Sequence, residues 1–128
     1  MQVASRRIAG AHDTSVAMTE KIFQPVLALA DVGRGRMRSC RIGDLELVVC
    51  HTRDGVFAVD NVCTHAFARM SEGYLKGTRL TCPLHGATFD VRTGAVLGGP
   101  ATIPLATYQT RVVGDELEVA LPPEAGTK

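Results

Sequence analysis

Four side chains that can bind a soft metal lie in two short segments of this chain. The first segment contains Cys63 and His65, and the second contains Cys82 and His85. Each segment therefore offers one thiolate and one imidazole, and residues 66–81 separate the two. Two closely spaced Cys/His pairs indicate a metal site far more strongly than any of the four residues alone.

Two kinds of metal centre accept such ligands. A mononuclear zinc site is one of them, but the familiar zinc patterns place two cysteines on one segment and two histidines on another. A mixed-ligand [2Fe–2S] cluster binds both thiolates at one iron and both imidazoles at the other, so two loops lying across it would each supply one of each. We therefore favour one [2Fe–2S] cluster, held by Cys63, His65, Cys82 and His85, over a zinc-stapled binding module.

The remaining reactive side chains do not form a second site. With the four ligands assigned, no nucleophile with an adjacent base is left, and no glycine-rich phosphate loop precedes a helix. His12 and His51 are expected to be solvated surface groups, and Cys40 and Cys50 to be buried thiols rather than a disulfide. The basic cluster within residues 34–41 is interpreted as a solvated face rather than a docking site.

Length and composition limit the class of protein. The chain has 128 residues, 45% of them hydrophobic, which suits one domain with a modest core and no large enzyme cleft. Its formal net charge is +1 and it has no Trp, so we expect no nucleic-acid partner. No apolar run approaches the roughly 18 residues of a membrane span, and none follows Arg6 and Arg7 as an export signal requires, so we expect a cytoplasmic protein without a membrane partner.

The pattern of the chain is that of short strands and tight turns. Residues 1–19 lack a clear period and are predicted to be a flexible tail, so the domain is placed at 20–128. The alternating segments 45–50 and 116–121 predict half-buried strands with one wet face. Asp54 and Gly55 predict a hairpin turn before the strand 56–59. Turn residues throughout favour an all-β antiparallel sandwich or barrel, with residues 63–73 and 82–86 as loops.

The segment from Cys63 to Pro100 resembles Rieske ferredoxins, and in particular the ferredoxin components of bacterial aromatic-ring-hydroxylating dioxygenase systems. The matching motifs are Cys63–Ala66, Ser71–Tyr74, Cys82–Gly86 and Phe89–Gly94. The resemblance implies two antiparallel sheets and a small loop subdomain that holds the cluster. It also implies that Cys63 and Cys82 bind the inner iron, that His65 and His85 bind the outer iron, and that residues 98–100 form a third, shielding loop.

The same resemblance implies a function. The protein would be a monomeric one-electron carrier rather than an enzyme, taking electrons from a flavin-containing reductase and passing them to a terminal oxygenase. The alternatives are the Rieske ferredoxin of a diiron aromatic monooxygenase and the small Rieske subunit of a nitrite-reductase-like enzyme. Rieske proteins of respiratory cytochrome bc complexes carry hydroxyl donors where this chain has Ala87 and Phe89, so we expect a reduction potential near the low end of the Rieske range.

The partners of a carrier must approach its cluster closely. We therefore expect the rings of His65 and His85 to face solvent. The surrounding docking surface is predicted to comprise Phe67, Arg69 and Met70 on one side and Gly99 and Pro100 on the other.

Overall fold

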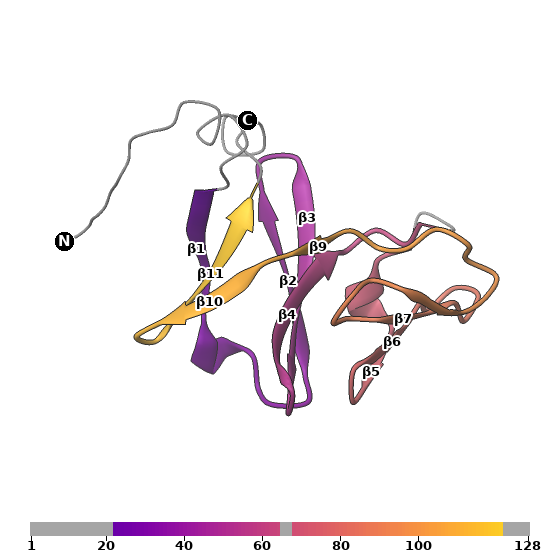
Figure 1. Cartoon of the computed structure of the whole chain (residues 1–128), viewed down its shortest axis with the longest axis horizontal. Coiled ribbons are helices and arrows are strands. Elements are labelled where there is room, and N and C mark those ends of the chain that lie inside the picture. Colours follow the sequence, from indigo (N-terminus) through magenta and orange to yellow (C-terminus); the bar gives the residue numbers. More distant parts are fainter. Residues whose placement is uncertain (1–21, 65–67, 122–128) are drawn as a thin grey trace.

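The computed structural model describes residues 22–64 and 68–121, and these form short strands with two single-turn 3₁₀ helices (Figure 1). The predicted tail and His12 lie outside the described residues. The elements are β1 (Ile22–Ala28), η1 (Leu29–Asp31), β2 (Met37–Ile42), β3 (Leu45–Thr52), β4 (Gly55–Asp60), η2 (Met70–Glu72), β5 (Tyr74–Lys76), β6 (Arg79–Thr81), β7 (Thr88–Asp90), β8 (Val96–Gly98), β9 (Thr107–Tyr108), β10 (Thr110–Val113) and β11 (Glu116–Leu121).

The strands pair antiparallel in three sheets. One has the order β1-β11-β10, the second β2-β3-β4-β9 and the third β5-β6-β7-β8. In Figure 1 the strands β5, β6 and β7 lie to one side of the first two sheets, as a separate small layer. The prediction of an all-β antiparallel fold is confirmed. Cys63 follows β4 of the second sheet, and Cys82 follows β6 of the small layer.

The predicted hairpin around Asp54 and Gly55 is confirmed and has a clear local cause. Thr52 pairs with Gly55, so Arg53 and Asp54 form a two-residue turn between β3 and β4. Gly55 has a φ of 136°, which a residue without Cβ adopts readily. The Thr52 hydroxyl donates to the Gly55 carbonyl over 2.9 Å and accepts from the Asp54 amide over 3.1 Å. The Thr52 side chain therefore closes the turn.

Strand β3 separates two hydrophobic cores. Val48 and Cys50 belong to the core shared with the small layer, whereas Leu47 and Val49 belong to the core shared with β11. All four side chains are fully buried. The prediction that this strand has one wet face is therefore wrong, because sheets and loops cover both of its sides. The same prediction holds only in part for β11: on the face expected to be wet, Glu116 is exposed and Glu118 is half-buried, but Ala120 is buried.

Within residues 22–64 and 68–121, no helix has the length and apolar character needed to cross a membrane.

Candidate iron–sulfur site

The two predicted ligand segments lie in loops, the first after β4 and the second after β6. In the first, the Cys63 amide donates to the Ala68 carbonyl over 2.9 Å, and Val62 and Arg69 form an isolated bridge, so the loop closes on itself. The single turn of η2 follows, which the prediction of a plain loop over residues 63–73 did not include.

The second loop is a tight turn after β6. The Cys82 amide donates to the Ala87 carbonyl over 2.8 Å, and the Gly86 amide donates to the Cys82 carbonyl over 3.3 Å. Gly86 has a φ of 79°, which lets the turn close at this point. The backbone therefore holds Cys82 and presents residues 83–86 outward, all of them exposed.

A glycine allows the two loops to approach each other closely. A Cβ added at Gly73, the end of the first loop, would lie 1.9 Å from the carbonyl oxygen of Thr81, directly before Cys82. No side chain fits such a gap, so any other residue at position 73 would move the loops apart. The segments that carry Cys63 and Cys82 are thus neighbours in space as well as similar in sequence.

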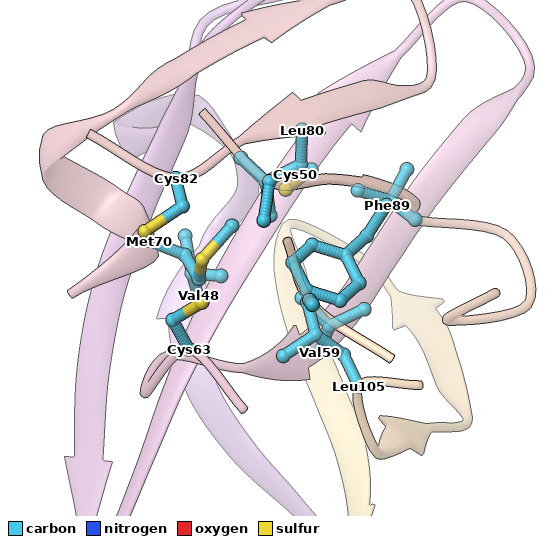
Figure 2. Packing of buried hydrophobic residues seen from close by; sticks show 12 residues of the cluster. Val48, Cys50, Val59, Cys63, Met70, Leu80, Cys82, Phe89 and Leu105 are labelled. Atoms are coloured by element: carbon cyan, nitrogen blue, oxygen red, sulfur yellow. The ribbon is translucent and has the colours of Figure 1, made fainter. Parts of the chain in front are cut away.

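The predicted ligands differ in their exposure. Cys63 and Cys82 are 4% and 1% exposed and belong to one buried cluster. Figure 2 shows them on the same side of that cluster, with Met70 beside them. His85 is exposed, whereas His65 lies outside the described residues. The described part of the chain contains no group of three or more His, Cys, Asp or Glu side chains arranged for a metal ion.

The buried side of the site is apolar. Met70, Leu80, Ala87 and Phe89 are fully buried and pack in the same cluster as the two cysteines (Figure 2). The prediction that Met70 forms part of an exposed docking surface is therefore wrong, because the turn of η2 directs this residue into the core. An apolar environment of this kind controls the dielectric around a metal centre and hence its potential.

A third segment borders the first loop. The hydroxyl of Thr64 donates to the carbonyl of Ile103 over 2.7 Å, which attaches residues 101–105 to the loop that carries Cys63. Ala101 and Leu105 are buried, whereas the Ile103 side chain is 59% exposed. The predicted shielding loop at residues 98–100 is a different segment: Gly98 ends β8, Gly99 and Pro100 are exposed, and the hydrogen bond with Thr64 is made by Ile103.

Sequence reasoning missed a charged cluster beside the first loop. Glu46 accepts from Arg69 and from Arg41, at 3.2 Å and 3.1 Å, and the neighbouring arginine Arg69 lowers the pKa of Glu46. Burial, followed by the charge of Glu46, raises the pKa of Asp60. The basic residues Arg34, Arg36 and Arg38 are exposed as expected, but Arg41 is part of this cluster rather than simply solvated.

The remaining predicted residues are placed as follows. His51 is half-buried, and its Nδ1 lies 2.8 Å from the carbonyl oxygen of Val32, so it joins two segments instead of being a solvated surface group. Neither Cys40 nor Cys50 is in a disulfide. Cys50 is buried, which raises its thiol pKa to about 12, whereas Cys40 is only half-buried.

Comparisons with known proteins agree with this arrangement. Residues 22–109 match the model of the Rieske [2Fe-2S] domain, and the chain belongs to this family. It is 38% identical to the ferredoxin component of the naphthalene 1,2-dioxygenase system of Pseudomonas aeruginosa, over 81% of this chain and 99% of that protein.

Two solved structures are also similar. One is a complex of reduced oxygenase and oxidized ferredoxin in carbazole 1,9a-dioxygenase, with a TM-score of 0.73 at 37% identity over 77% of this chain and 93% of the matched chain. The other is the ferredoxin of carbazole 1,9a-dioxygenase from Nocardioides aromaticivorans IC177, with a TM-score of 0.73 at 32% identity over 80% and 98% of the two chains.

Proposed function

We propose that this chain is the ferredoxin component of an aromatic-ring-hydroxylating dioxygenase system and carries single electrons to the terminal oxygenase. The observation that carries the proposal is the match to free-standing ferredoxin components over almost their whole length. A protein with these relatives is an electron carrier, and the aromatic substrate would be bound and oxidised by the terminal oxygenase instead.

We assign Cys63 and Cys82 to the inner iron and His65 and His85 to the outer iron of one [2Fe–2S] cluster. The donor set fits this group, since the two thiols are buried and the imidazole of His85 is exposed. When bound, such a cluster accepts and releases one electron at a time, and its neutral imidazole ligands raise its potential above that of a four-cysteine cluster. The exposed position of His85 would bring the edge of the centre to the surface.

We also revise the docking surface, because Met70 is buried. The Leu84 side chain, next to His85, is 57% exposed, and the Ile103 side chain, attached through its carbonyl to the loop of Cys63, is 59% exposed. Apolar side chains exposed beside both ligand loops favour a small patch for transient partners. Phe67 lies outside the described residues.

The electron donor is proposed to be a flavin-containing reductase, and the carrier a cytoplasmic monomer. Mixing the purified chain with such a reductase, NADH and the oxygenase tests both electron-transfer steps. We expect reduction of the visible chromophore by the reductase and its reoxidation by the oxygenase. A carrier that is reduced but never reoxidised would favour one of the other oxygenase or reductase systems.

The cluster is tested by analysis of iron and acid-labile sulfide in the wild type and in Cys63→Ser. We expect equal amounts of iron and sulfide in the wild type and loss of both in the variant, because metal binding and folding are coupled. One equivalent of zinc without sulfide in the wild type would refute the assignment.

A further inference from the structure

An ion pair joins the first ligand loop to the central sheet. Arg69, in the loop, donates to Glu46 of β3 from Nε to Oε1 over 3.2 Å and from Nη2 to Oε2 over 3.4 Å. Arg41 of β2 donates to the same carboxylate, to Oε2 over 3.1 Å. The Glu46 side chain is only 16% exposed, so its charge is less screened than that of a fully solvated group. A forked contact of this kind defines orientation as well as distance.

A buried asparagine joins the same two parts of the fold. Asn61, which is 1% exposed, accepts from the Ser71 amide at its side-chain Oδ1 over 2.8 Å. Its backbone amide donates to the Glu46 carbonyl over 2.9 Å, and its carbonyl accepts from the Met70 amide over 2.7 Å. Asn61 is therefore bonded to β3 on one side and to η2 on the other.

These contacts lie at both ends of the segment that carries Cys63. Asn61 precedes Cys63 by two residues, and Arg69, Met70 and Ser71 follow the loop. The second loop is closed by a backbone hydrogen bond within the loop, from the Cys82 amide to the Ala87 carbonyl. The position of the first loop relative to the second therefore depends on how firmly its two ends are attached to β3. Groups outside the ligand set that orient the ligands affect both retention and properties of a metal centre.

We propose that Glu46 and Asn61 are positioning residues that hold the first ligand loop in register with the second and thereby retain the cluster. Neither residue needs to touch the cluster, since Glu46 acts through Arg69 and Asn61 acts through the Ser71 amide and its own backbone hydrogen bonds. The inference rests on the proposed [2Fe–2S] site. It adds two residues that the Cys/His motifs do not include.

The chain offers a matched control for Glu46. Glu118 pairs with Arg111 over 2.7 Å, with side-chain exposures of 18% and 54%, close to the 16% and 56% of Glu46 and Arg69. That second pair joins β10 to β11, in the three-stranded sheet. Glu46→Gln and Glu118→Gln each remove one negative charge from a similarly exposed side chain, and only Glu46 contacts a ligand loop, in addition to its ion pair with Arg41.

The test compares holoprotein of the wild type, Glu46→Gln, Glu118→Gln and Asn61→Ala. The decay of visible absorbance under a ferrous chelator is measured well below the melting temperature, together with the electron paramagnetic resonance spectrum and reduction potential of the isolated protein. We expect decay about 3–10-fold faster for Glu46→Gln and Asn61→Ala, with a broadened or shifted spectrum, and wild-type values for Glu118→Gln. In addition, the double variant Glu46→Gln/Arg69→Gln should lose its absorbance no faster than the faster of the two single variants, because the two substitutions disrupt the same ion pair.

The proposal is overturned if Glu46→Gln decays at the wild-type rate with an unchanged spectrum, or if Glu118→Gln decays as fast as Glu46→Gln. Asn61 is buried and its variant could fail to fold, but Glu46→Gln changes a partly exposed side chain and decides the question by itself. Absence of iron and sulfide from the wild type would instead refute the proposed function, so the two failures are distinguishable.

Discussion

Met70 is predicted to be a structural residue of the cluster site. Its side chain has no exposed surface and packs in the same cluster as Cys63 and Cys82, on the same side of that cluster (Figure 2). Truncation to alanine removes three side-chain heavy atoms from a site that is closed on all sides. Substitutions of this type in a core lower the free energy of unfolding by about 2–5 kcal/mol.

The expected size of the effect is large enough to measure by urea unfolding. With an m-value of about 2 kcal/mol/M, a loss of 2–5 kcal/mol lowers the midpoint by about 1–2.5 M. Met70→Leu nearly conserves volume and should cost less than about 1.5 kcal/mol. Met37→Ala is the matched control, because Met37 packs against the same cluster but is only half-buried, and it should cost less than half as much as Met70→Ala.

The assay follows circular dichroism and visible absorbance of the holoprotein together, so that unfolding and cluster loss are recorded in the same sample. We expect Met70→Ala to lose its colour at a lower urea concentration than Met37→Ala, and Met70→Leu to transfer electrons at the wild-type rate. A midpoint for Met70→Ala no lower than that of Met37→Ala would refute the core role. Slow electron transfer by Met70→Leu with unchanged stability would restore the docking role for this residue.

Three further changes test the surface, the charges and the buried side of the site. Leu84→Glu should slow electron transfer to the oxygenase about tenfold, or roughly 1.4 kcal/mol, without changing the reduction potential. The control Val112→Glu, at a similarly exposed position on β10, should leave the rate unchanged. Equal effects of the two substitutions would contradict the proposed docking surface. Burial, followed by the nearby Glu46 charge, raises the pKa of Asp60 above its ordinary value of 3.8. Protonated Asp60 therefore stabilises the folded state at a pH below its pKa in the unfolded chain, and this contribution is lost as the pH rises through its pKa in the folded protein. Asp60→Asn should therefore raise the melting temperature at pH 7, and the gain should disappear near pH 3; an equal gain at both pH values would exclude this cause. Ala87→Ser should raise the reduction potential if its hydroxyl donates to a cluster sulfur; voltammetry showing a wild type already at the high end of the Rieske range of roughly −150 to +300 mV would contradict the expectation that donors are missing.

Local features of the fold were predictable because they depend on neighbours in the chain. The turn at Arg53–Gly55 is determined by a glycine with positive φ and by the hydroxyl of Thr52, all within four positions. The burial of both faces of β3 was also indicated by the sequence, since residues 47–50 form an uninterrupted apolar run, but the alternation of the longer segment was given more weight. Alternation alone does not distinguish a strand with one covered face from one with two.

The kind of centre proposed for this protein follows from the sequence by itself, because the chemistry of thiolate and imidazole and the spacing within each segment are local properties. The tertiary structure decided what surrounds it. Whether Met70 faces solvent or core depends on how η2 packs, and Arg69 meets Glu46 only because the first loop folds back onto β3. Contacts between residues so far apart in the chain depend on the packing of the sheets, which spacing within a motif does not encode.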